Sequence, residues 1–238
     1  MHLDTVIQEI HQKYGRRALC RGVSRTSQAT RVIHTGFAQL DDALGSGGLP
    51  RGTIVEFLGC PTSGKTTLAL KFLAQAQKQA DSAWVCYVDP ARAFDPEYAH
   101  YCGLDLSRLI IAAGTEDPAQ TLAMVEALAT ADGIAAVVLD AREQRAGLPD
   151  ATSRRRLASG SRPGAVLVVL RDTLAGSAPS PFASIRLQIV RENWIWHHGD
   201  VRGYEARVDV LKNRLGPSGR SVLLSLGVEK SVYVNLLC

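Results

Sequence analysis

The hydrophobic positions in the first two thirds of the chain predict buried strands that alternate with helices. IAAVVLD (134–140) and AVLVVLR (165–171) are continuous apolar runs, as expected of strands covered on both faces. The other candidate strands are TIVEFLG (53–59), AWVCYVD (83–89) and LIIAAG (109–114). Helical spacing covers 65–79 and 117–132, and Asp117 and Pro118 supply the cap and first turn of the second helix. This order predicts an α/β fold, a mostly parallel sheet with helices on both sides.

The last third has a different pattern. ASIRLQIVRENWIWHH (183–198) and YEARVDVLKNR (204–214) are long strand-like runs, and GDVRG (199–203) between them is a hairpin signal. Apolar residues alternate with charged ones from Tyr204 onward, which is typical of a half-buried antiparallel strand. SVLLSLG (221–227) and SVYVNLLC (231–238) predict two more short strands. We therefore expect an antiparallel C-terminal hairpin beside the parallel sheet.

The N-terminal segment differs from the rest of the chain. Val6, Ile7, Ile10 and Tyr14 recur at helical spacing and predict a short amphipathic helix over 4–14, with Gly15 as its stop. Its single apolar stripe needs another surface to cover it. RGVSRTSQATR (21–31) has no apolar periodicity and is typical of a linker. We expect a boundary near residue 31, with a helix-strand oligomerisation segment and linker over 1–31 and the core over 32–238.

Composition narrows the possible classes of protein. No apolar run approaches the roughly 18 residues needed to cross a membrane, and the N-terminus lacks the apolar core of a signal peptide. The five cysteines are scattered without a C-x-x-C pair, which favours reduced thiols over a disulfide framework or a zinc site. We expect a soluble cytoplasmic protein.

Positive charge is concentrated in two segments. Residues 1–31 hold six Arg and Lys against two acids, and residues 142–171 hold seven Arg against two acids, on a chain whose net charge is +4. This distribution suggests a polyanionic partner. Solvated helix faces and linkers explain the same charges equally well.

GCPTSGKTT matches the phosphate-binding loop G-x-x-x-x-G-K-[ST], with a strand before it and a helix after it. Gly59 and Gly64 let backbone N–H groups turn toward phosphate oxygens, Lys65 would neutralise the β- and γ-phosphates, and the Thr66 hydroxyl would bind Mg²⁺. Asp140, at the end of a buried strand, would hold the water shell of the metal. The predicted ATP-binding loop consists of Gly59, Cys60, Pro61, Thr62, Ser63, Gly64, Lys65, Thr66 and Thr67.

The chain resembles the RecA family of bacterial recombinases. The resemblance is carried by TGFAQLDDALGSGGLPRGTIVEFLGCPTSGKTTLAL (35–70), YVDPARAFDPEYAHYCGLDLSRL (87–109), FASIRLQI (182–189) and GYEARVDVLKNRLGP (203–217), and by the weaker IQEIHQKYGRRAL (7–19). It implies a RecA-type core that binds ATP and Mg²⁺.

The resemblance also implies roles for individual residues. Asp95 and Tyr98 match residues that hold adenine, and Lys212 and Arg214 match two cations that reach the γ-phosphate of the neighbouring subunit. In the family the N-terminal helix packs on the adjacent subunit, which would cover the apolar stripe of residues 6–14. Nucleotide binding would then stabilise the subunit interface.

Three departures separate the chain from the family pattern. The catalytic glutamate position is Ala91, and a methyl group cannot orient water, so we expect slow or absent hydrolysis. A glutamine that senses the γ-phosphate is missing from VVLRD, where Arg171 and Asp172 stand, and both DNA loops are shortened. We expect the C-terminal domain of the family to be missing, because the sequence ends soon after the core.

DNA binding is expected to be weak. The candidate phosphate contacts are Arg142, Arg145, Arg154, Arg155 and Arg156. No aromatic residue lies among them, so there is no base-stacking platform, and a solvent-facing helix is an equally good interpretation.

Three functions stay open at this point. We favour a RecA-like ATP-binding protein of DNA repair or recombination that assembles with itself or with a RecA-type partner on single-stranded DNA, with at most a weak ATPase activity. The first alternative resembles ImuA, an accessory of mutagenic translesion repair that binds RecA and a polymerase without strand exchange. The second alternative is a nucleotide-gated protein-binding module outside DNA repair.

Trp194 and Trp196 lie near the tip of the predicted hairpin, beside His197 and His198. A metal site would need further ligands, so we reject it. We expect the tryptophans to pack under the basic segment or to form an interface patch.

Overall fold

The computed structural model describes residues 3–15, 32–79, 83–115, 117–142, 150–153, 164–173, 180–197 and 200–227. The chain divides into two compact units, residues 1–30 and 31–238. In the first unit, helix α1 (Leu3–Tyr14) ends at Gly15, whose N–H donates to the carbonyl of His11. Val6, Ile7 and Ile10 are partly exposed along this helix. The predicted N-terminal helix is therefore present.

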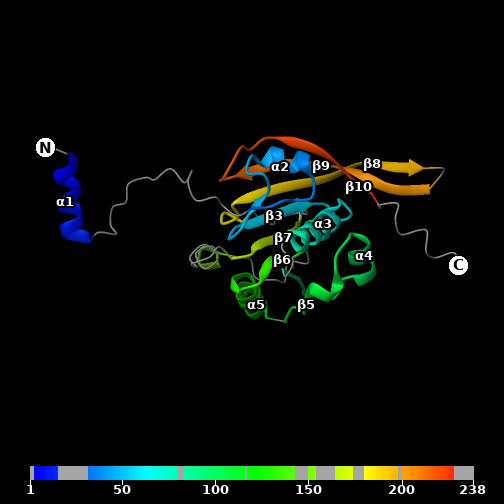
Figure 1. The fold of residues 1–238 in the computed structure, drawn as a ribbon, viewed down its shortest axis with the longest axis horizontal. Coiled ribbons are helices and arrows are strands. Elements are labelled where there is room, and N and C mark those ends of the chain that lie inside the picture. Colours follow the sequence, from blue (N-terminus) through cyan, green and yellow to red (C-terminus); the bar gives the residue numbers. More distant parts are fainter. Residues whose placement is uncertain are drawn as a thin grey trace. The chain divides into compact units, whose positions relative to one another are not determined.

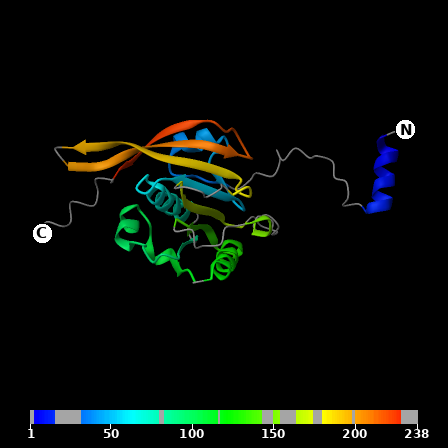
Figure 2. The same ribbon diagram turned by 180° about the vertical axis from the view of Figure 1, so that it is seen from behind.

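The second unit is built on an eight-stranded sheet in the order β10-β9-β8-β3-β7-β6-β4-β5 (Figures 1 and 2). Six neighbouring strands run parallel: β8 (Ile185–His197), β3 (Ile54–Gly59), β7 (Val166–Asp172), β6 (Ile134–Asp140), β4 (Trp84–Asp89) and β5 (Leu109–Ala113). β9 (Asp200–Asn213) and β10 (Ser221–Gly227) extend the sheet with antiparallel pairing. The expected α/β fold, a mostly parallel sheet with an antiparallel C-terminal hairpin, is confirmed.

Helices cover both faces of the parallel strands. On one face, Val55 and Phe57 of β3 join the core formed with α2 (Ala38–Leu44), α3 (Lys65–Lys78) and α4 (Pro96–Tyr101). On the other face, Val137 and Leu139 of β6 pack with Val125 of α5 (Pro118–Thr130). Every residue of β3 and β6 is buried, which explains why these strands have no alternating pattern in the sequence.

The β8–β9 hairpin extends beyond the rest of the sheet in Figure 1, and its second strand begins earlier than the sequence predicts. The predicted turn GDVRG is mostly strand, because β9 already begins at Asp200. Gly203 pairs with Gly227 of β10, and a Cβ atom on Gly203 would lie 2.5 Å from the Gly227 Cα. This glycine therefore permits close strand approach and does not form the turn.

Several short elements have no counterpart in the sequence-based expectations. They are β1 (Val32–Ile33), β2 (Leu49–Pro50), α2, α4 and the 3₁₀ turn η1 (Leu106–Arg108). α4 is capped by Asp95, whose side chain accepts the Tyr98 N–H, and α5 is capped by Asp117 as expected. The strand predicted over 231–238 lies outside the described residues.

Candidate nucleotide-binding site

The loop of residues 59–64 connects the carboxyl end of β3 to the first turn of α3. Gly64 has a φ of +100° and Thr62 a φ of +64°, so the backbone reverses sharply before the helix begins. The N–H of Leu68 donates to the Gly64 carbonyl, which starts the helical hydrogen bonding there. The N–H groups of the preceding residues therefore lie at the positive end of the helix dipole, where anions bind.

Lys65 is almost completely buried in this loop, with 3% of its surface exposed. Its ammonium group donates to the carbonyls of Gly59 and Cys60 at 2.7 Å each. It also lies 2.8 Å from the carboxylate of Asp172, at the end of the neighbouring strand β7. Asp172 therefore neutralises the lysine in this arrangement.

Asp140 ends β6, as predicted, at the same edge of the sheet. Its carboxylate accepts the Tyr87 hydroxyl at 2.8 Å and pairs with both the Nε and an Nη atom of Arg142. The hydrogen bond to Asp140 raises the pKa of Arg142, whereas burial opposes that rise. Arg142, a predicted DNA contact, therefore has a carboxylate partner beside the loop, and its contact with DNA stays a prediction.

The hairpin packs directly against the loop. A Cβ atom on Gly64 would lie 2.8 Å from the ring of Tyr204 on β9, so a larger residue there would force the ring or the loop to move. The Tyr204 hydroxyl donates to Thr67 Oγ1 at 2.7 Å. This contact joins the hairpin to the first turn of α3.

A cleft of about 390 Å³ lies between the loop and the hairpin. Its lining comprises Thr62, Ser63, Gly64, Lys65, Thr66, Thr67, Arg142, Arg191, Trp194 and Tyr204. Arg191 lies over the Trp194 ring, 4.3 Å from its centroid, and the Trp194 and Tyr204 rings meet edge to face. Among the described residues that line the cleft, three are cationic and none carries a carboxylate, so the cleft suits a polyanion.

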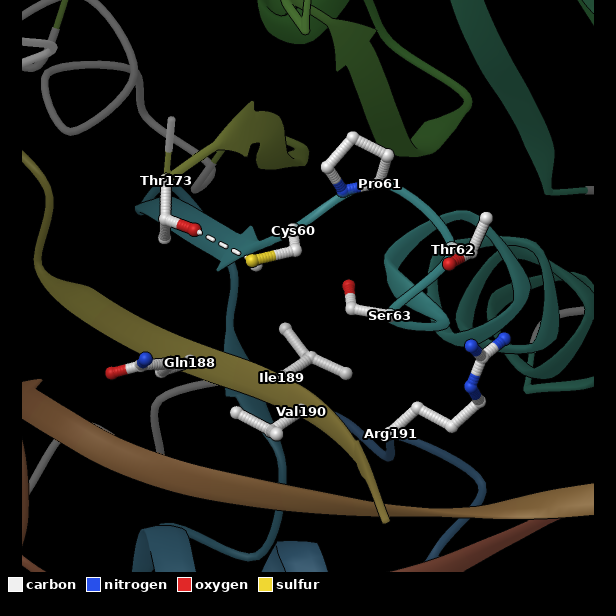
Figure 3. A pocket seen from close by; sticks show the side chains of 10 residues that line it. Cys60, Pro61, Thr62, Ser63, Thr173, Gln188, Ile189, Val190 and Arg191 are labelled. Carbon is white, nitrogen blue, oxygen red and sulfur yellow. Dashed lines mark hydrogen bonds between the residues drawn. The ribbon is translucent and has the colours of Figure 1, made fainter. Parts of the chain in front are cut away.

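A smaller cavity of about 180 Å³ lies on the other side of the loop (Figure 3). Cys60 and Thr173 face each other across 3.5 Å, and Arg191 extends from β8 toward the loop beside Thr62. Gln188, Ile189 and Val190 of β8 complete the wall. The loop is therefore held between the end of β7 and the hairpin.

The predicted adenine residues lie near the same helix turn. The Tyr98 hydroxyl is 2.7 Å from Thr67 Oγ1, so Tyr98 and Tyr204 meet at one threonine. Burial raises the pKa of both phenols, and each therefore stays protonated at neutral pH. Asp95 is exposed and caps α4, which positions Tyr98.

Lys212 and Arg214 lie back from the loop, toward the amino end of β3. Lys212 pairs with Arg186 near the start of β8, whereas the loop follows the carboxyl end of β3. Both cations donate to the carbonyl of Pro181, at 3.1 Å and 2.9 Å. This placement separates them from the loop of their own subunit.

Some of the remaining candidate residues lie outside the described part of the chain, and others are exposed on its surface. Arg145, Arg154, Arg155 and Arg156 lie outside the described residues, as does His198. Trp194 and Trp196 are 48% and 62% exposed near the hairpin tip. Ala91 is exposed and follows β4 after Asp89 and Pro90. No helix of the described part is long and apolar enough to span a bilayer.

Sequence reasoning missed the roles of Arg191 and Tyr204. Their contacts with the loop depend on how the hairpin folds across it, and alternation along β9 indicates only that Tyr204 is inward-facing. The position of Asp172 could have been predicted from the sequence, because it ends an apolar strand in the same way as Asp140. The carboxyl ends of parallel strands meet at one sheet edge, so both acids belong beside the loop.

Comparison with known proteins places this site in a family. The family model described as the RecA N-terminal domain matches residues 1–151. The chain is 33% identical to Protein RecA of Acidiphilium cryptum over 92% of its own length and 73% of the relative. It is 30% identical to Protein RecA of Pseudomonas fluorescens, over 98% of its own length and 74% of the relative. It is also 30% identical to Protein RecA of Rubrobacter xylanophilus, over 97% of its own length and 80% of the relative. The chain belongs to the RecA family.

The expected RecA-type core is therefore confirmed, and membership supports a RecA-like recombination or repair ATPase core. The glycine-rich loop, the buried lysine and the acid at the end of β6 are all present where such a core needs them. In this structure Lys65 and Asp140 are each neutralised by another side chain of the chain.

Proposed function

We propose that this protein is a RecA-like ATP-binding protein of DNA repair or recombination, in which the nucleotide stabilises assembly and hydrolysis is slow or absent. The observation that carries this proposal is the cleft beside the glycine-rich loop, with Lys65, Arg142 and Arg191 on its walls. Lys65 at the start of α3, Arg142 after β6 and Arg191 on β8 give the cleft a preference for an anion such as a nucleoside triphosphate.

Slow hydrolysis is supported by the partners of the nearby acids. Asp172 pairs with Lys65, Asp140 pairs with Arg142, and Asp89 accepts the Phe94 N–H at 2.7 Å. A general base must hold a water and accept its proton, and Asp172 and Asp140 already serve as counter-ions. Asp89 accepts through Oδ2 only, and its buried Oδ1 has no hydrogen-bond partner among the described residues. Ala91 cannot supply the missing group.

Assembly is supported by the position of Lys212 and Arg214. Because they lie back from the loop along the strands, with Lys212 level with Glu56 of β3, they are placed to meet a nucleotide on another subunit. The partly exposed stripe of α1 in the N-terminal segment (residues 1–31) would give a second contact, through Val6, Ile7 and Ile10. Single-stranded DNA is a weaker candidate partner, which rests on the basic segment 142–171.

Magnesium would come with the nucleotide. The Thr66 hydroxyl, in the first turn of α3 and on the cleft wall, is the side chain suited to bind it. Asp140 is engaged by Arg142 and Tyr87, so it holds no metal shell in this arrangement.

A second candidate function is a RecA-related accessory that binds another repair protein. The observation that favours it is the exposed pair Trp194 and Trp196 at the end of a hairpin that extends beyond the core (Figure 2). Tryptophan is enriched where protein partners bind.

The test is ATP binding and turnover with and without single-stranded DNA, in the native protein, Lys65→Ala and Ala91→Glu. Tight binding that needs Lys65, with negligible turnover that Ala91→Glu raises, supports a nucleotide that acts as a structural clamp. DNA-stimulated turnover in the native protein would show that a working base exists. Equal ATP binding by Lys65→Ala would contradict the site itself.

A further inference from the structure

Asp140 and Arg142 form a closed pair where a divalent metal would be expected. Oδ1 of Asp140 accepts Nε of Arg142 at 2.7 Å, and Oδ2 accepts Nη2 at 2.5 Å. Oδ2 also accepts the Tyr87 hydroxyl at 2.8 Å. The Arg142 backbone N–H is a fourth donor, 3.4 Å from Oδ1, so protein donors face all of the roughly four lone-pair positions of the Asp140 carboxylate.

The pair does not fit a carboxylate-held magnesium ion. Mg²⁺ usually keeps several of its waters, so a carboxylate that holds it must be accessible to the hydrated ion. The Asp140 side chain is only 3% exposed. Arg142 neutralises the charge of Asp140 that would attract the metal. Nor does any group of three or more His, Cys, Asp or Glu side chains in the described part of the chain form a metal site.

The guanidinium of Arg142 nevertheless faces the cleft, where a ligand would bind. Its side chain is 33% exposed, and it lines the same cleft as Lys65 and Thr66. Asp140 engages Nε and Nη2, and among the described residues Nη1 has no acceptor. A guanidinium fixed on one side by a carboxylate is preorganised to donate to phosphate oxygens on the other.

We infer that Arg142, held on Asp140, is the resident cation of this nucleotide site and binds the phosphates of a nucleoside triphosphate whether or not a divalent metal accompanies them. The inference rests on the proposed ATP-binding function. Asp140 is then a positioning residue, since it orients the arginine and touches no ligand. Lys65 and Arg191, the other two cations of the cleft, would bind the same phosphate chain from the loop and from the hairpin.

The experiment is calorimetric titration of the intact protein with ATP, in excess Mg²⁺ and in excess EDTA. We expect dissociation constants within about threefold of each other, because the fixed guanidinium is present under both conditions. In EDTA, Arg142→Gln should bind ATP at least about tenfold more weakly than the native protein, as expected for loss of a charge-assisted hydrogen bond. In Mg²⁺ the same variant should recover most of that loss, because Asp140 is then free for the metal.

Two further variants keep the result interpretable. Arg142→Lys retains a positive charge and should retain most of the binding in EDTA. Arg108→Gln is the matched control, because Arg108 also pairs with an aspartate, Asp105 at 2.8 Å, but lines neither cavity of the loop. It should bind as the native protein does, and circular dichroism should show each variant folded.

Native binding that disappears in EDTA would overturn the inference, as would Arg142→Gln binding that is unchanged in EDTA. In either case binding in Mg²⁺ that depends on Lys65 would leave the proposed function standing. Absence of ATP binding under both conditions would overturn the proposed function as well.

Discussion

The ammonium group of Lys65 lies 2.8 Å from the carboxylate of Asp172, so the lysine of the glycine-rich loop has a counter-ion within the protein. Asp172 is at the end of β7, beside Gly59 in the register of the sheet. A bound phosphate would have to share Lys65 with this acid, and the acid would repel the phosphate.

Asp172→Asn should therefore strengthen ATP binding. The amide keeps the shape of the side chain but removes one negative charge, and an effect of about 1 kcal/mol, or roughly fivefold in the dissociation constant, is expected. The measurement is calorimetric titration with ATP. Asp105→Asn, which changes an aspartate in the distant turn η1, is the control. Weaker binding by Asp172→Asn would mean that Asp172 orients Lys65 and does not compete for it.

Gly64→Ala should abolish nucleotide binding. A Cβ atom at this position would lie 2.8 Å from Tyr204, and the residue has a φ of +100°. The hairpin would have to move away from the loop, and the free energy of unfolding should fall by roughly 1–3 kcal/mol. Urea unfolding and ATP titration measure the two effects.

Gly219→Ala is the matched control for that change. Gly219 also has a positive φ, +78°, but a Cβ atom there would have no neighbour within 4 Å. Gly219→Ala should lower the free energy of unfolding only modestly, through backbone strain, and should bind ATP as the native protein does. If the two variants behaved alike, the contact with Tyr204 would not be what fixes the loop.

Glu56→Ala should destabilise the core strongly. Glu56 is 1% exposed and lies 3.0 Å from Arg171 and 2.9 Å from Arg186, with the Ser180 N–H as a third donor. Its loss leaves buried cations without this neutralising charge, at a cost of about 3–5 kcal/mol. Urea unfolding measures the change.

The exposed pair of Glu192 and Arg207 gives the comparison for Glu56. Both side chains are more than a third exposed, so Glu192→Ala should change the free energy of unfolding by less than about 1 kcal/mol. An equally small effect of Glu56→Ala would show that water reaches the buried network.

Much of the fold could be predicted because burial leaves a direct mark on the sequence. β6 and β7 are nearly uninterrupted apolar runs, and the strand-loop-helix around Lys65 has residue types that few other structures require. The hairpin was predicted from alternation, but GDVRG was assigned to a turn, because a glycine that allows close strand approach has the same signature as one that turns the chain.

The chemistry of the site could be predicted only in part. Lys65, Thr66 and Asp140 follow from the motif and from the end of a strand. The partner of Asp140 does not follow, since Arg142 belongs to a segment whose arginines look alike in the sequence. Arg191 and Tyr204 reach the loop only through the fold of the hairpin, which no local pattern encodes.

Lys212→Ala with Arg214→Ala should abolish ATP-dependent assembly and leave ATP binding by the single subunit within about twofold, because the removed cations act on a neighbour's phosphates. Light scattering and calorimetric titration separate the two properties. Arg220→Ala is the matched control, since Arg220 also donates to a backbone carbonyl, that of Asp42. Assembly that survives the double change would place the interface elsewhere.

Cys60 and Cys86 should differ sharply in their reaction with a maleimide. Burial raises the pKa of the Cys86 thiol to about 11, so at pH 8 only about one molecule in a thousand carries the reactive thiolate. Cys60 is exposed in the glycine-rich loop, beside Thr173. Peptide mass mapping should show Cys60 modified and Cys86 intact at pH 8, and ATP should slow the modification of Cys60 severalfold because the phosphates cover the loop.

Cys60→Ser should keep ATP binding after maleimide treatment that abolishes it in the native protein. Modification of Cys86 at the rate of Cys60 would mean that the central strands open to solvent, and lack of protection by ATP would place the nucleotide away from the loop.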